Sequence, residues 1–165
     1  MAKLPLDDPR WNELKIRNGS ATGVPDILRR LLNDPLNDEV FADLWPELCS
    51  EDTAWSAAYA AIPYVNDIAA KRPTENRTEH LWTVGYVVMC TEDEGQIPRD
   101  LVAEYHEALP VTLAMLAESI VHKHGRDDTR YLLAACAALQ GHVKLGELLA
   151  NLDCGCPHCE EELEY

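Results

Sequence analysis

Apolar residues recur along this chain at intervals of three and four positions, the spacing that places them on one face of an α-helix. Sustained alternation of apolar and polar residues, the pattern of a half-buried strand, does not occur, so we expect no β-hairpin. Prolines and capping residues divide the apolar pattern into short segments. The pattern predicts helices over residues 9–15, 25–33, 38–49, 53–72, 79–90, 98–109, 110–121, 131–139 and 143–152.

Short helices joined by brief loops predict an all-α fold. Helix pairs of this length would stack as antiparallel hairpins in a short α-solenoid, and a compact helical bundle is the alternative. The chain has 165 residues, so we expect one helical domain over residues 1–152, followed by a Cys-rich acidic tail over residues 153–165. The core between the last two helices is expected to contain a set of alanines and leucines, Leu133, Ala134, Ala137, Ala138, Leu145, Leu148 and Leu149.

The charge of the chain indicates the class of its partner. There are 29 acidic and 14 basic residues, which give a formal net charge of −15. A surface of this sign repels nucleic acid and anionic membranes and attracts a positively charged protein surface. We therefore expect a basic protein partner, with no direct nucleic-acid binding and no membrane binding.

Residues 31–70 carry eight acidic residues and no lysine or arginine. Within this window, Glu39, Asp43 and Glu47 stand at i, i+4 and i+8, so on a helix they form one negative stripe whose neighbours repel each other. A solvated helix face is the alternative interpretation. The predicted partner-binding residues are Asp38, Glu39, Asp43, Glu47, Glu51, Asp52 and Trp55.

The location of the protein is predicted from its apolar segments. The first residues contain no apolar stretch of the kind found in signal peptides. The longest apolar run, residues 81–90, is about half of what a membrane-spanning helix requires. We expect a cytoplasmic protein.

Three cysteines near the C-terminus, Cys154, Cys156 and Cys159, predict a zinc site. Two thiolates two residues apart in a Cys-Pro-x-Cys turn can both reach one tetrahedral ion. His142 or Cys136 could supply a fourth ligand, or the site could be shared between two chains. Free thiols in a frayed tail are the alternative.

Sequence motifs of enzymes are absent from the chain. It has no Gly-rich phosphate-binding loop and no Gly-x-Ser-x-Gly elbow. We therefore predict no catalytic residue and do not expect an enzyme, although distant residues of a helical fold could still form a catalytic site.

The segment from Leu48 to Ala69, reading LCSEDTAWSAAYAAIPYVNDIA, resembles a helical unit of bacterial HEAT-like repeat proteins. Those units show a Thr-initiated, alanine-rich helix that runs into a proline. The resemblance implies a binding scaffold, and some such proteins act as immunity proteins of bacterial toxins. Our leading hypothesis is an acidic module that occludes the basic surface of a toxin acting on nucleic acid. The alternatives are a zinc-binding enzyme or metal-responsive regulator that uses the C-terminal cysteines, and a generic adaptor scaffold.

Overall fold

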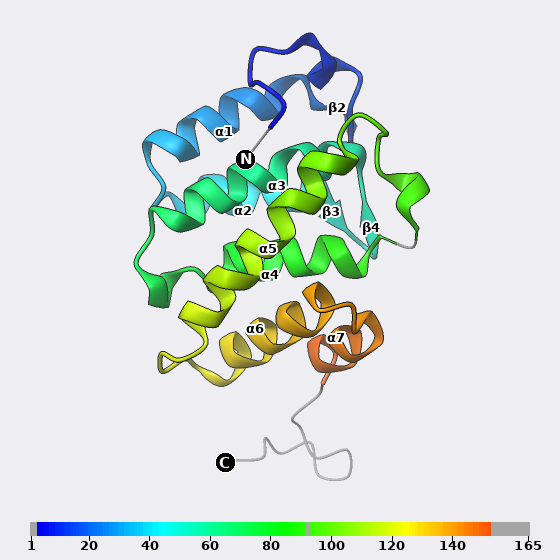
Figure 1. The fold of residues 1–165 in the computed structure, drawn as a ribbon. Helices are drawn as coiled ribbons and strands as arrows, with labels where there is room; N and C mark the ends of the chain where they lie inside the picture. The colour runs from blue at the N-terminus through cyan, green and yellow to red at the C-terminus, as the bar shows by residue number, and fades with distance from the viewer. Residues whose placement is uncertain (1–2, 92, 153–165) are drawn as a thin grey trace.

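The computed structural model describes residues 3–91 and 93–152, and they are predominantly α-helical, as the apolar spacing predicts (Figure 1). The helices are α1 Val24–Asn33, α2 Asp38–Leu48, α3 Ser56–Ala70, α4 Thr78–Met89, α5 Val102–Ser119, α6 Arg126–Leu139 and α7 Val143–Ala150. Short 3₁₀ turns cover Pro9–Asn12, Ala21–Gly23, Thr74–Asn76 and Glu94–Gln96. No helix in the described ranges is both long and apolar enough to cross a membrane.

Helix α3 is the centre of the fold. Nearly every residue from Ala57 to Ala69 is buried, and α3 packs against α1, α4 and α5. Its many alanines carry little side-chain volume, so these helices can approach it closely. The buried Asn66 donates to the carbonyl of Ala108 at 2.9 Å and accepts from the hydroxyl of Thr112 at 2.8 Å, which ties α3 to α5.

Helices α4, α6 and α7 pack on each other through small residues at the lower end of the view in Figure 1. A Cβ on Gly85 of α4 would lie 2.4 Å from the Cβ of Ala135 in α6. A Cβ on Gly146 of α7 would lie 2.9 Å from the carbonyl oxygen of Ala134. Only glycine permits these approaches.

Two hairpins that we did not expect interrupt the helices. The first pairs β1 Lys15–Ile16 with β2 Gly19–Ser20, and the second pairs β3 Cys49–Ser50 with β4 Thr53–Ala54, both antiparallel. The first carries a recognisable signal, because Asn18 and Gly19 form the Asn-Gly pair typical of tight hairpins. Its strand β1 also ends the predicted helix 9–15 after the single turn Pro9–Asn12.

The second hairpin replaces the predicted start of the helix at residue 53. Its two-residue turn is Glu51-Asp52, with φ of 52° and 57°, and Thr53 pairs with Ser50. Helix α3 therefore begins at Ser56, with Trp55 at its N-cap and no side-chain cap.

The predicted break at Pro110 is wrong, because α5 continues through this proline. A proline inside a helix removes one backbone hydrogen bond but leaves the rest of the helix intact when packing holds it. Here the buried Tyr105, Ala108 and Thr112 hold both sides of Pro110 on the core.

The predicted burial of three leucines near the C-terminus is also wrong. Leu133, Leu145 and Leu148 are 42%, 48% and 64% exposed. Helices α6 and α7 meet through Ala134, Ala138 and Gly146. The small size of these residues brings the two helix backbones together and leaves the three leucines outside the contact.

Candidate functional site

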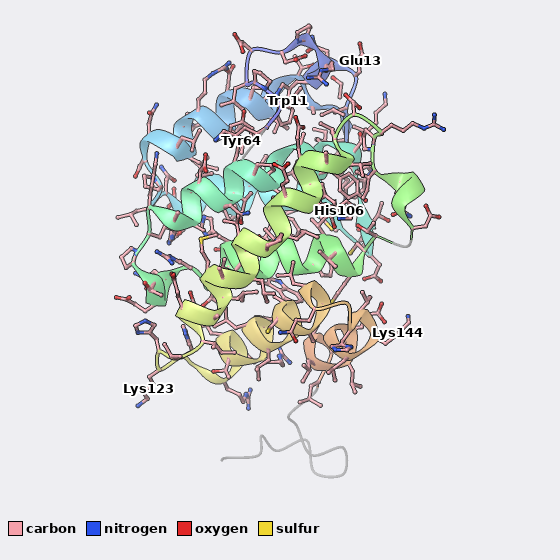
Figure 2. All side chains as sticks on the ribbon, viewed as in Figure 1. Trp11, Glu13, Tyr64, His106, Lys123 and Lys144 are labelled. Carbon is pink, nitrogen blue, oxygen red and sulfur yellow. The ribbon has the colours of Figure 1, made fainter. Side chains whose placement is uncertain are left out.

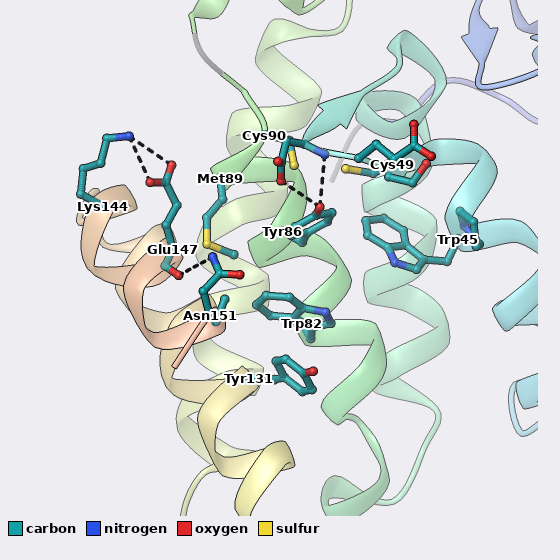
Figure 3. Close-up of a pocket in the computed structure, with 15 residues that line it drawn as sticks. Trp45, Cys49, Trp82, Tyr86, Met89, Cys90, Tyr131, Lys144, Glu147 and Asn151 are labelled. Atoms are coloured by element: carbon teal, nitrogen blue, oxygen red, sulfur yellow. Dashed lines mark hydrogen bonds and ion pairs between the residues drawn. The ribbon is translucent and has the colours of Figure 1, made fainter. Parts of the chain in front are cut away.

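A pocket of about 750 Å³ opens where the end of α2, the β3–β4 hairpin, α4, α6 and α7 meet (Figure 3). Its size falls in the range of sites that take a small molecule or a large side chain. Its lining comes from three separate stretches of the sequence, residues 45–52, 82–90 and 131–151, so the pocket is a product of the tertiary fold.

Four aromatic rings line one side of this pocket in an unbroken series. The rings of Trp45 and Tyr86 lie 5.9 Å apart, edge to face, and those of Tyr86 and Trp82 lie 5.5 Å apart. Tyr131 follows at 4.7 Å from Trp82. Trp82 and Tyr86 stand at i and i+4 of α4, the spacing that aligns side chains on one helix face. All four are half-buried, so ring surface remains accessible. We refer to these four residues as the aromatic wall.

Carboxylates stand around the aromatic wall. Asp52 and Glu51 come from the tight turn, and Glu147 comes from α7. The hydroxyl of Tyr86 donates to the carboxylate of Asp52 at 3.2 Å and accepts from the Asp52 backbone N–H at 3.3 Å. Burial raises the pKa of Tyr86, so the phenol keeps the proton that it donates. This pair of bonds fixes the Tyr86 ring and the turn together.

Two of these carboxylates already have cationic neighbours. Glu147 pairs with Lys144 at 3.0 Å, one helical turn away, and Glu51 pairs with Arg17 of the first hairpin. Asp52 has no ion-pair partner among the described residues. Among the described residues that line the pocket, Lys144 is the one basic side chain, so the three acids give this lining an excess of negative charge.

Two buried thiols close one end of the pocket. Cys49 lies on β3 and Cys90 follows α4, and they contact each other. The contact with Cys90, together with burial, raises the pKa of Cys49 above its ordinary value.

Two predicted acidic residues of α2 have partners from other parts of the fold. Asp38, beside the negative stripe, pairs with Arg72 at 2.8 Å, and Glu47 of the stripe accepts a hydrogen bond from the side-chain amide of Asn18 at 2.7 Å. Sequence windows could not show this, because the compensating residues lie outside residues 31–70 and reach α2 only through folding. Arg17 and Asn18 are positioned there by the hydrogen bond from the Arg17 N–H to the carbonyl of Glu47.

Glu39 and Asp43 are the two stripe residues that stay exposed with no ion pair inside the described part of the chain. Pro46 shares their helix face, at i+7 and i+3, and also lines the pocket. The exposed acids and the pocket therefore adjoin each other. Of the other predicted residues, Glu51 and Asp52 reach the pocket, whereas Trp55 is half-buried at the start of α3 and does not line it.

The predicted zinc ligands Cys154, Cys156 and Cys159 lie outside the described residues. Within residues 3–91 and 93–152 no group of three His, Cys, Asp or Glu side chains could hold a metal ion. His142 is exposed and Cys136 is half-buried. The zinc site stays a prediction, which elemental analysis of protein purified without added metal can test.

Sequence reasoning missed the aromatic wall. The available signal was the i, i+4 spacing of Trp82 and Tyr86, which places two large rings on one side of α4. Comparison of the chain with protein-family models, with curated proteins and with solved structures finds no match.

Proposed function

We propose that this chain is an acidic binding module that docks on the basic surface of a protein partner. The observation that carries the proposal is the continuity of Glu39 and Asp43, exposed and without ion pairs in the described ranges, with a pocket whose rim holds Glu51 and Asp52. A solvated surface needs no such pocket beside its unpaired acids. The net charge of −15 supports the same class of partner.

The partner we propose is a bacterial toxin that acts on nucleic acid. Such a protein needs a positive groove for phosphates, and a row of carboxylates can occupy that groove in their place. In this proposal the helices form a short HEAT-like stack that presents the acidic face, and the module acts by occlusion, in agreement with the lack of enzyme motifs in the sequence.

Electrostatic attraction acts mainly on the rate of association. Complementary charge raises association rates by about 10- to 1000-fold, and added salt removes the gain. A change of charge on α2 should therefore slow binding more than it speeds dissociation.

The test compares two variants of equal net charge. In the first, Glu39→Lys, Asp43→Lys and Glu47→Lys reverse the α2 face. In the control, Glu13→Lys, Glu107→Lys and Asp128→Lys reverse exposed acids on other elements; Glu13 lies at the far end of the molecule from Lys144 (Figure 2). The partner used is the purified product of the reading frame that adjoins this one in the genome.

We expect the α2 variant to associate at least about tenfold more slowly at low salt and to protect nucleic acid poorly, while the control changes little. The proposal fails if the α2 variant associates and protects as well as the parent chain.

A further inference from the structure

We propose that the pocket is a receptor for one arginine side chain, with the guanidinium against the aromatic wall and the carboxylate of Asp52. The inference rests on the proposed function only for the origin of that arginine, which would be a residue of the basic partner. The pocket itself can be tested without the partner.

The aromatic side chains of the pocket are suited to bind a guanidinium. A guanidinium is planar, weakly hydrated and stacks on aromatic faces, and tryptophan is the strongest partner for a cation. Trp45 and Trp82 line the pocket next to Tyr86, and both are half-buried, so part of each side chain is accessible. Met89 also lines the pocket, on the side of α7, and its thioether can contact the methylene stem of the arginine (Figure 3).

The carboxylates at the pocket give it the negative charge that a guanidinium requires. Asp52 has no ion pair among the described residues, and the Tyr86 hydroxyl holds its carboxylate in place without neutralising it. Glu51 and Glu147 have cationic neighbours, but Glu51 is 74% exposed and Lys144 is 91% exposed. Exposed pairs of this kind are weak and exchange readily. An entering cation can therefore pair with the fixed carboxylate of Asp52. It can also replace the present cationic neighbours of Glu51 and Glu147.

The turn of the β3–β4 hairpin has a backbone conformation that its residues do not favour. Glu51 and Asp52 both have φ in the left-handed region, which disfavours residues other than glycine and asparagine. An Asn-Gly turn would close the same hairpin without this cost. The residues present instead place two adjacent carboxylates at the rim, and a bidentate guanidinium suits paired carboxylate oxygens.

A contact of this kind already occurs within the described part of the chain. The guanidinium carbon of Arg130 lies 4.8 Å from the centroid of the Tyr131 ring. Arg130 does not line the pocket, so the pocket side of the aromatic wall is available to a second guanidinium.

The probe is N-acetyl-arginine methylamide, titrated into the full chain by calorimetry and followed by tryptophan fluorescence. A single side chain should bind weakly, with a Kd of about 1 mM. The comparison ligands are the citrulline analogue, which is uncharged but nearly the same shape, the lysine analogue and tetramethylammonium.

The decisive variant is Asp52→Asn, because asparagine tolerates a positive φ and the hairpin should persist. We expect it to weaken arginine binding at least about tenfold, whereas Glu107→Gln on α5 leaves binding unchanged. Trp82→Leu should weaken binding as well, and unchanged far-UV circular dichroism confirms that both variants fold.

The inference is overturned if arginine does not bind at about 20 mM, or if citrulline, lysine or tetramethylammonium binds as well as arginine. It is also overturned if Asp52→Asn binds like the parent chain. Arginine binding in the absence of any effect of the α2 charge reversal on partner association would leave this inference standing and remove the proposed function. Absence of arginine binding, together with slower partner association of the α2 variant, would remove this inference and leave the proposed function standing.

Discussion

His80 should make this fold sensitive to mild acid. The imidazole is 1% exposed and stacks on Phe41 with 3.9 Å between ring centroids, so it couples α4 to α2. Neither ring nitrogen has a hydrogen-bond partner among the described residues. Burial, with a smaller effect of the Arg72 charge, lowers the pKa of His80 from 6.5 to about 3.

The direction of the pH effect follows from which state binds the proton. Below pH 6.5 the unfolded chain protonates His80, whereas the folded chain keeps it neutral down to about pH 3. Stability is therefore constant above the unfolded pKa and falls as the pH drops towards the folded pKa. The loss from this one group is about 2 kcal/mol between about pH 7.5 and about pH 5.

Urea unfolding at a series of pH values measures this loss. The variant His80→Leu should remove most of the pH dependence in that window, because leucine does not titrate. The control His122→Gln replaces an exposed histidine and should keep the dependence of the parent. Equal pH profiles for the parent and His80→Leu would refute a buried neutral imidazole at this position.

Two further predictions concern the helix packing and the tight turn. Gly85→Ala would place a Cβ 2.4 Å from that of Ala135 and should lower the free energy of unfolding, measured in urea, by about 1–3 kcal/mol or more. The control Gly23→Ala has no atom within 4 Å of the new Cβ and should change this free energy little. A normal stability for Gly85→Ala would contradict the close α4–α6 approach. Glu51→Asn, which keeps the hydrogen bonds between Tyr86 and Asp52, should raise the free energy of unfolding by about 1 kcal/mol, because asparagine tolerates the left-handed conformation. A lower melting temperature for this variant would show that the acidic turn is not strained.

Sequence periodicity was sufficient where one helix has two distinct faces. In α2 the same period placed Phe41 and Leu44 in the core and Glu39 and Asp43 in solvent. For α6 and α7 the prediction was right for Ala134, Ala137 and Ala138, which are buried, and wrong for Leu133, Leu145 and Leu148. The small residues let the two helices meet on a narrower face than the number of apolar residues suggests. Leu145 and Leu148 then have no neighbour to cover them in the described structure.

The candidate site was predictable only in part, for a different reason. Glu51 and Asp52 were identified as acidic residues of a charged window, but their hairpin has no turn signature in the sequence. The conformation is supported by Tyr86, which lies on another helix and binds both the backbone and the side chain of Asp52. The aromatic wall likewise combines residues from α2, α4 and α6, which no local pattern relates.

The acidic face of α2 and the pocket should contribute to binding in separable ways. Glu39 and Asp43 act through the field that they create over solvent, and salt screens this field over about 10 Å at moderate ionic strength. Asp52 acts through contact with a group that has left solvent, where screening is weaker. Reversal of the α2 charges should therefore lower the association rate and its salt dependence, whereas Asp52→Asn should raise the dissociation rate with little effect on that dependence. Because Pro46 belongs to both surfaces, one basic partner can bind both at the same time. We expect the partner to make its first direct contacts with the pocket at the turn formed by Glu51 and Asp52.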